Sequence, residues 1–148
     1  MSKFCSCCEK SSPWLLSLMR VVIALMVMQH GGQKIFGYPA TRHALPPLFS
    51  TAGMGGMVEL AGGLLVLLGL FTRPAALILS AKMAATYLVL YAGLAWWPIH
   101  NQGELAVIYC FVFLYLSAAG PGPFSLDHLR KCSAAPSPAP PPSPPQPG

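Results

Sequence analysis

Four charged residues interrupt apolar stretches of this sequence: Arg20, Glu59, Lys82 and Glu104. An ionisable group in hydrocarbon costs on the order of 3 kcal/mol or more, so it ordinarily faces a helix-bundle interior and a partner of opposite charge. Two cations and two anions could balance one another there. Such a polar interior could bind a polar ligand or handle protons, and it is the best pointer to function that the sequence offers.

The stretches that carry these charges are long enough to cross a membrane. Of the 148 residues, 54% are hydrophobic and 9% are charged, which is too apolar for an ordinary soluble domain. Each of four predicted spans is close to the ~20 residues that cross a hydrocarbon core. These spans cover residues 14–36, 54–71, 75–97 and 104–119. The predicted fold is all-α, an integral membrane four-helix bundle.

The bundle is predicted as one domain at 13–127, in which Pro13 opens the first helix. A polar cytoplasmic tail is expected at 1–12, and a disordered, Pro-rich cytoplasmic tail is expected at 128–148. The connection between the first two spans, 37–53, contains several prolines and is predicted as a long, irregular outer loop. The second connection is minimal, so the second and third helices should form an antiparallel hairpin.

Lysines and arginines near the span ends predict the orientation. With four spans, both termini share one side of the membrane with the second connection. That side holds five basic residues against two on the other, which places both termini in the cytoplasm. The five are Lys3, Lys10, Arg73, Arg130 and Lys131, and the two are Lys34 and Arg42. These residues are scattered rather than gathered in one patch, so no nucleic-acid partner is expected, and the lipid bilayer is the evident one.

The cysteines give no firm site. Cys5, Cys7 and Cys8 form a cluster before the first span, and they could bind a metal, be acylated or belong to a tail without a role. Because no second C-x-x-C pair and no nearby His completes a zinc site, no metal centre is predicted. Cys110 lies within the fourth span and is expected to pack as a small apolar residue. Cys132 follows that span.

Helical periodicity of about 100° per residue shows which residues share a face with each charge. One stripe follows from each span. The stripes are Arg20, Val27, His30 and Lys34; Gly55, Glu59, Gly62, Val66 and Gly69; Lys82, Thr86, Val89 and Gly93; and Glu104, Ile108, Phe111, Tyr115 and Ala118. The glycines beside Glu59 indicate close helix packing on that face.

Depth in the membrane then suggests partners. Five residues belong to the outer half and are expected to cluster beneath the outer loop: His30, Gln33, Lys34, Glu59 and Glu104. Arg20 and Lys82 belong to the inner half, where Arg20 is expected near Tyr115. For both cations, reaching the headgroups by snorkelling and pointing into the bundle are equally open alternatives.

The outer cluster has a structural and a functional interpretation. Intramembrane ion pairs can simply fix helix register, and Glu104 at a helix start can simply cap that helix. Yet a His, a Lys and two carboxylates also suit a ligand with a polar head and an apolar body. A quinone fits this description, because its carbonyl oxygens need hydrogen-bond donors and its reduction needs a proton source.

Several motifs, in order along the chain, resemble the DoxX family of bacterial membrane proteins. They begin with Arg20 and continue through QHGGQKIFGYP at 29–39, VELAGGL at 58–64, LGLFTRP at 68–74, NQGELA at 101–106 and GPGPFSLD at 120–127. The resemblance covers about 14–127. It implies a four-helix, multi-pass protein of the bacterial inner membrane that is described as a candidate oxidoreductase. Relatives often have Glu where this chain has Lys82, so a mechanism with a third carboxylate is not implied.

The resulting functional hypothesis is a DoxX-like membrane subunit that binds a quinone-type ligand for an oxidoreductase partner, soluble or membrane-bound. Glu59 and His30 would handle protons, Lys34 and Arg20 would stabilise anionic oxygen, and Glu104 would set the local charge. Gln33 and Tyr115 complete the expected ligand contacts. No resident redox cofactor is evident from the motifs, since there is no G-x-G-x-x-G after a strand.

Three functional alternatives stay open at this point. The chain could be part of an enzyme, or a non-enzymatic scaffold or small-molecule-binding subunit whose charges only specify helix packing. A small transporter is the weaker alternative, because the spans lack the Gly/Pro-broken helix pairs typical of transporters. Whether the chain forms a homo-oligomer is a further open question.

Overall fold

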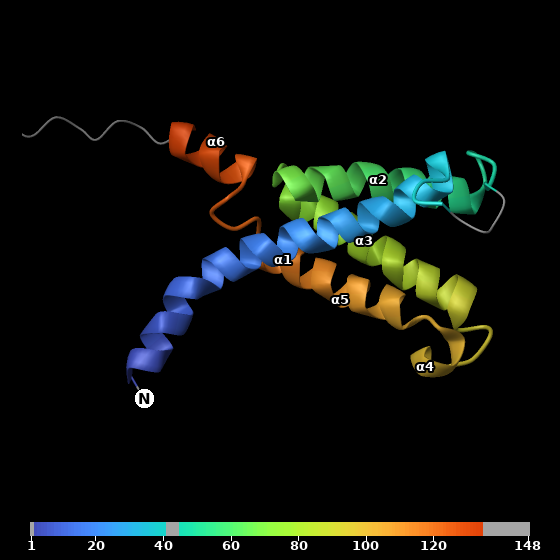
Figure 1. The fold of residues 1–148 in the computed structure, drawn as a ribbon, viewed down its shortest axis with the longest axis horizontal. Helices are drawn as coiled ribbons and strands as arrows, with labels where there is room; N and C mark the ends of the chain where they lie inside the picture. The colour runs from blue at the N-terminus through green and yellow to red at the C-terminus, as the bar shows by residue number, and fades with distance from the viewer. Residues whose placement is uncertain (1, 41–44, 135–148) are drawn as a thin grey trace, which may run out of the picture.

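The computed structural model describes the backbone of residues 2–40 and 45–134, and the side chains of residues 12–40 and 45–130. Within these residues all regular structure is helical, as predicted (Figure 1). The elements are α1 (Ser2–Phe36), α2 (Thr51–Leu68), α3 (Thr72–Thr86), the π-helix η1 (Tyr87–Tyr91), α4 (Pro98–Asn101), α5 (Glu104–Ala119) and α6 (Leu126–Ala134).

Three helical segments are long and apolar enough to cross a membrane. They are Ser12–Phe36 of α1, Thr51–Leu68, and Thr72–Tyr91, which joins α3 and η1. No more than 28% of the residues in their most apolar windows are buried, and many large apolar side chains of these helices are exposed. Helix α5 is apolar but shorter, with 16 residues, which corresponds to about 24 Å of length. Outward-facing apolar surface of this extent indicates contact with a lipid bilayer.

Both ends of the chain differ from the prediction. Helix α1 begins at Ser2 and continues through Pro13, whereas Pro13 was expected to open it. Part of the segment expected to be disordered, 128–134, belongs to α6. The Ser125 hydroxyl accepts a hydrogen bond from the backbone N–H of His128 (3.1 Å), which satisfies a free donor of the first turn. Residues 135–148 lie outside the described residues.

The second and third helices both end earlier than their apolar composition suggested. Helix α2 ends at Leu68 because Gly69, at a left-handed φ of 68°, closes it with bonds to the carbonyls of Leu65 and Val66. Its start at Thr51 follows from Ser50, whose hydroxyl accepts from the N–H of Gly53. The third span ends with η1 at Tyr91, before residue 97. The predicted bounds of α5 are confirmed.

The long helices pack mainly in three pairs: α1 on α2, α2 on α3, and α3 on α5. Their shared core includes Val27, Val66, Leu79 and Phe113, each with no exposed surface. Helices α1 and α2 come especially close at Gly31, where an added Cβ would lie 2.7 Å from the carbonyl oxygen of residue 56. This close approach brings polar side chains of the two helices within reach of one another.

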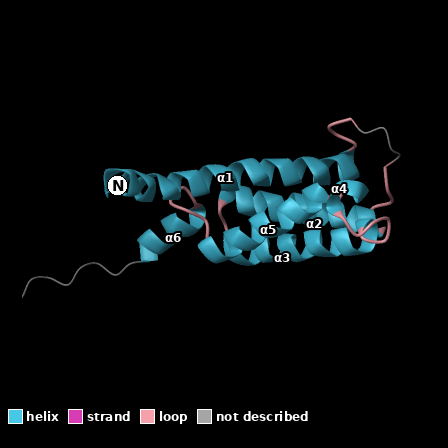
Figure 2. Cartoon of the chain, turned by 90° about the horizontal axis from the view of Figure 1, so that it is seen from below, coloured by secondary structure: helices cyan, strands magenta, loops and turns pink. Residues whose placement is uncertain are grey.

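The two ends of the bundle are built differently. Helix α6 lies where α2 ends and α3 begins, and the start of α1 extends beyond the bundle at this same end (Figures 1 and 2). We call it the α6 end. Helix α4 and the connection between α1 and α2 lie at the opposite end, the α4 end. There the Asn101 side chain donates to the carbonyls of Tyr91 (3.1 Å) and Ala95 (2.7 Å).

Candidate functional site

Glu59 holds two lysines in the middle of the bundle. Its carboxylate is 2% exposed, and both of its oxygens accept from Lys34 Nζ of α1, at 2.7 and 2.8 Å. Lys82 Nζ of α3 donates to Glu59 Oε1 as well. One carboxylate on α2 therefore connects three helices through ion pairs.

Small residues on α2 make this geometry available. A Cβ added to Gly56 would lie 2.8 Å from the Cβ of Lys34, and one added to Gly55 would lie 3.4 Å from Cε of Lys82. Both glycines lie one turn before Glu59. With no side chains there, the aliphatic stem of each lysine can lie along α2 and bring its ammonium group to the carboxylate.

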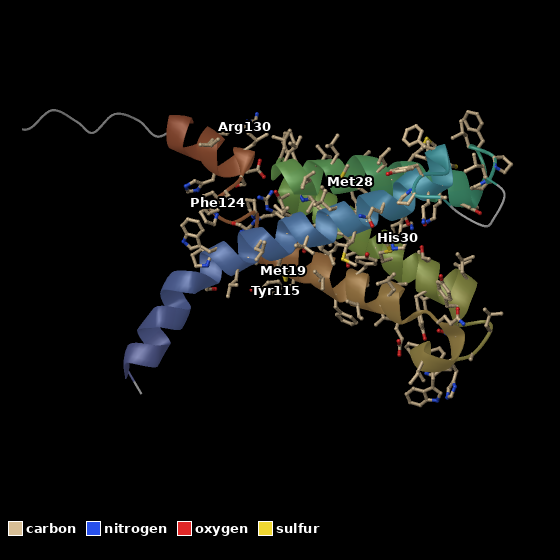
Figure 3. All side chains as sticks on the ribbon, viewed as in Figure 1. Met19, Met28, His30, Tyr115, Phe124 and Arg130 are labelled. Carbon is tan, nitrogen blue, oxygen red and sulfur yellow. The ribbon has the colours of Figure 1, made fainter. Side chains whose placement is uncertain are left out.

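His30 and Tyr109 extend this polar region toward α5. Their rings meet edge to face, with centroids 5.9 Å apart and an interplanar angle of 83°. His30 lies within electrostatic reach of Glu59 and both lysines, and Tyr109 lies within reach of Glu59. Figure 3 shows His30 in the half of the bundle away from Phe124 and α6. We call these five residues, Lys34, Glu59, Lys82, His30 and Tyr109, the Glu59 cluster.

The Tyr109 hydroxyl is a buried polar group of this cluster whose hydrogen bonding is incomplete. Tyr109 is 2% exposed, yet its hydroxyl has no hydrogen-bond partner among the described residues. A buried polar group without a partner costs roughly 1 to 3 kcal/mol. Such groups mark places where a water, an ion or a ligand is to be expected.

The cluster is also unbalanced in charge and in hydrogen bonding. Two ammonium groups share one carboxylate, so one positive charge is left over. Each ammonium has three N–H bonds, and the Tyr109 hydroxyl adds a donor, whereas Glu59 supplies the acceptors. The cluster therefore has donors and positive charge to offer to a group that accepts hydrogen bonds and carries, or develops, negative charge.

Sequence reasoning missed Tyr109 because it assigned the wrong face of α5 to the interior. The expected stripe contained Ile108, Phe111 and Tyr115, which are 55%, 65% and 57% exposed. The buried residues are Ala106, Tyr109, Phe113 and Leu116. These residues also recur at helical spacing, so the sequence contained a second possible stripe. That stripe places a tyrosine hydroxyl among apolar residues.

Three other expected ligand contacts lie outside the Glu59 cluster. Gln33 is half-buried on α1 beside Lys34, and no hydrogen bond of its side chain is found among the described residues. Glu104 is exposed at the start of α5, which is the position expected of a residue that favours the helix N-terminus. Tyr115 is exposed on α5, in the half of the bundle away from His30 (Figure 3).

Lys82 and Arg20 both point into the bundle instead of snorkelling. Lys82 was expected in the inner half near the headgroups, but it reaches Glu59 because α3 begins at Thr72, so that position 82 lies midway along Thr72–Tyr91. Arg20 was expected near Tyr115. It is 1% exposed and donates from Nη1 to the carbonyls of Val66 (2.8 Å) and Leu67 (2.9 Å).

Arg20 therefore belongs to the α6 end rather than to the Glu59 cluster. Val66 lies about 10 Å along α2 from Glu59. Arg20 also donates from Nη2 to the carbonyl of Phe124, in the segment between α5 and α6. Its Nε is buried without a partner among the described residues. By binding backbone carbonyls of two segments, Arg20 ties α1 to the end of α2 and to the chain after α5.

Asp127 makes the complementary contact at the same end. Its carboxylate accepts from the backbone N–H groups of Phe71 and Thr72, both at 3.0 Å, and from the Thr72 hydroxyl at 3.3 Å. It thus caps the first turn of α3. Although desolvation opposes it, these hydrogen bonds, together with nearby Arg130, lower the pKa of Asp127 below its ordinary value.

Within the part of the chain whose side chains are described, no group of three or more His, Cys, Asp or Glu residues could hold a metal ion. The side chains of Cys5, Cys7, Cys8 and Cys132 lie outside that part. Cys110 is half-buried between α3 and α5, where its carbonyl accepts from the Ser80 hydroxyl at 2.8 Å. This is a packing position.

Comparison with known proteins identifies the family. No solved structure matches the chain. An "Uncharacterized protein" of Haemophilus influenzae is 38% identical over 133 residues, a region that covers 81% of this chain and 93% of the relative. The family model DoxX matches residues 15–92, which include His30, Lys34, Glu59 and Lys82. The chain belongs to the DoxX family.

Proposed function

We propose that this DoxX-family protein binds a quinone-type ligand at the Glu59 cluster and presents it to an oxidoreductase partner. In this proposal α1, α2, the α3–η1 segment and α5 all cross the bacterial inner membrane, and both termini are cytoplasmic. The partner would hold the electron carrier, since the motifs of this chain include none for a nucleotide cofactor.

The surplus of hydrogen-bond donors in the Glu59 cluster is the observation that carries the proposal. Lys34 and Lys82 share the single carboxylate of Glu59, and the Tyr109 hydroxyl, which lies within electrostatic reach of that carboxylate, has no partner among the described residues. A quinone carbonyl oxygen is a hydrogen-bond acceptor that becomes negatively charged as the ring is reduced. The excess positive charge would stabilise that developing charge most strongly inside the membrane, where the dielectric constant is low.

Full reduction of a quinone requires two electrons and two protons, which yield the quinol. The electrons would come from the partner. The two protons would pass through His30 and Glu59, whose side chains can each hold and release one. Lys34 is 33% exposed, so it is the cluster residue through which protons would enter.

The scaffold alternative also has an observation in its favour. Glu59 binds lysines from α1 and α3, so the cluster holds three helices together whether or not it binds a ligand. Ion pairs that fix helix register would serve that purpose. They give no reason, however, for a buried Tyr109 hydroxyl that has no hydrogen-bond partner among the described residues.

The Tyr109→Phe variant separates the two functions. It removes one hydroxyl and leaves the ring contacts and the ion pairs in place. We expect the wild-type protein, purified in nanodiscs of native lipids, to retain quinone in a stoichiometric amount when its lipids are analysed by mass spectrometry. Tyr109→Phe should lower the retained quinone about tenfold, the equivalent of one hydrogen bond.

Tyr115→Phe is the matched control. It makes the same chemical change on the same helix, at an exposed side chain, and should leave quinone retention unchanged. A wild-type protein that retains no quinone contradicts the proposal and favours the scaffold. Equal loss in the two tyrosine variants would also contradict it, because the loss would then not come from the cluster.

A further inference from the structure

A second polar site lies at the α6 end, apart from the Glu59 cluster. A groove of about 720 Å³ opens between the start of α3, the segment that follows α5, and α6. Its charged lining residues include Arg73, Asp127 and Arg130. Arg130 lies on α6 at the edge of the bundle (Figure 3). The groove is large enough for a phosphate-bearing headgroup.

Neither arginine of this groove forms an ion pair with a carboxylate among the residues whose side chains are described. The carboxylate of Asp127 is engaged by the N–H groups and hydroxyl at the start of α3. Arg130 is near enough to influence Asp127 electrostatically but forms no ion pair with it. Two positive charges therefore face one carboxylate that is already occupied.

Packing holds both guanidinium groups at the groove. Arg73 lies against the turn that ends α5, where an added Cβ on Gly120 would be 3.4 Å from Arg73 Nε. Gly120 has a φ of 89°, a conformation that favours glycine, and without a side chain at this position the turn lets Arg73 approach closely. The Arg130 guanidinium lies 5.3 Å from the ring centre of Phe71. A planar guanidinium held in this way suits the oxygens of a phosphate group.

Apolar side chains around the groove indicate that the phosphate belongs to a lipid. Phe71 lines the groove and is 56% exposed. At the same end, the exposed rings of Trp14 and Phe124 pack with centroids 4.4 Å apart, as expected of aromatic residues at the membrane surface. Leu129 on α6 is exposed as well. A soluble phosphate would gain nothing from these contacts, whereas a glycerol and its acyl chains would.

From these observations we infer that the groove between α3 and α6 binds the headgroup of an anionic phospholipid through Arg73 and Arg130. This site is independent of the quinone proposal. It would anchor α6 to the membrane surface and hold the α6 end of the bundle at the headgroup layer.

The test is lipid retention by the full-length protein. The protein is reconstituted in mixed phosphatidylcholine and phosphatidylglycerol bilayers, extracted in mild detergent and analysed for bound lipid by mass spectrometry. We expect wild-type protein to enrich phosphatidylglycerol over its bulk share. Arg73→Gln or Arg130→Gln should lower the enrichment about fivefold, and the double variant on the order of 25-fold.

Two controls separate this site from general charge and from a phosphate site. Arg42→Gln removes the same charge from the connection between α1 and α2, and it should leave the enrichment unchanged. Excess inorganic phosphate should displace little phosphatidylglycerol. An equal loss in Arg42→Gln, unchanged enrichment in the double variant, or complete displacement by inorganic phosphate would overturn the inference.

A variant that keeps both charges guards against a loss of folding. Arg73→Lys/Arg130→Lys should retain intermediate enrichment, because lysine attracts phosphate without a bidentate fork. Helix content and melting temperature in pure phosphatidylcholine should match those of the wild type for all variants, since both arginines are exposed. Enrichment in the lysine pair as low as in the glutamine pair, with folding intact, would contradict an electrostatic lipid site.

Discussion

The charged side chains of two regions of this bundle are satisfied in different ways. At the α6 end, Arg20 and Asp127 bond to backbone groups: Arg20 to carbonyls at the end of α2, and Asp127 to N–H groups at the start of α3. In the Glu59 cluster, side chains bond to side chains, and the cations outnumber the anions. The first arrangement completes helix ends. The second leaves donors unused.

This difference separates a structural role from a functional one. Helix ends always leave backbone groups without partners inside the helix, so a charged side chain that binds them stabilises the fold. No such need explains the buried Tyr109 hydroxyl, which has no hydrogen-bond partner among the described residues. We therefore expect substitutions of Arg20 and Asp127 to change stability alone, and substitutions in the Glu59 cluster to separate stability from ligand binding.

The largest effect should follow from Glu59→Gln. The change leaves the Lys34 and Lys82 ammonium groups in the bundle without an anion, and removal of one partner from a buried ion pair costs about 3 to 5 kcal/mol. The free energy of unfolding, measured by SDS titration in mixed micelles, should fall by this amount. Glu59→Asp, which keeps the charge, should recover part of it. A loss below about 1 kcal/mol would mean that water already screens the charges of the cluster.

Arg20→Met should have the next largest effect. It removes a charged donor from three backbone carbonyls, those of Val66, Leu67 and Phe124. We expect a loss of roughly 3 kcal/mol in the free energy of unfolding, because hydrogen bonds to charged groups contribute about 1.5 to 3 kcal/mol each and partly compensate. Quinone retention per folded protein should not change. A selective loss of quinone with stability intact would move Arg20 back into the ligand site.

The sequence predicted this comparison only in part. Helical periodicity placed Arg20, Val27, His30 and Lys34 on one face of α1, and three of them reach the interior or the Glu59 carboxylate. The apolar composition correctly predicted the bounds of α5 and the all-α fold class. The depth of Lys82 in the membrane was predicted less well. The start of the third span was taken from hydropathy, whereas α3 starts at the residue that Asp127 caps.

The remaining errors have a common cause. The buried face of α5 is determined by its contact with α3. Because both faces of this helix carry apolar residues, helical periodicity alone could not show which face is buried. Arg20 binds backbone carbonyls, which no pattern of side chains reveals. For the same reason Tyr109 could be identified as a cluster residue only after α1 and α5 had been placed relative to one another.

Asp127→Asn should have a smaller effect than either change above. The amide keeps one acceptor oxygen for the N–H groups of Phe71 and Thr72 but loses the charge that favours a helix N-terminus. We expect a loss of about 1 kcal/mol, measured by the same SDS titration. A loss as large as that of Arg20→Met would show that the cap also holds α6 in place.

Asp127 should also make stability depend on pH. Its pKa is lowered below 3.8 in the folded protein, so the folded state favours the ionised carboxylate. Its contribution is then complete above about pH 5 and is lost as the pH falls through the folded-state pKa. Melting temperatures between pH 6 and about 3 should show a decrease in the wild type that is reduced in Asp127→Asn. Identical pH profiles would exclude Asp127 as the source.

The smallest effect on stability should come from Lys82→Met, although the residue is buried in an ion pair. Removing this lysine leaves Lys34 and Glu59 as a balanced pair, and replacing a buried charge with an apolar side chain of similar size is often neutral or stabilising. We expect the free energy of unfolding to change by less than about 1 kcal/mol. Quinone retention should nevertheless fall, because the excess positive charge is gone. A scaffold would show the same small change in stability with no quinone to lose, so quinone retention in this variant is the measurement that decides the comparison.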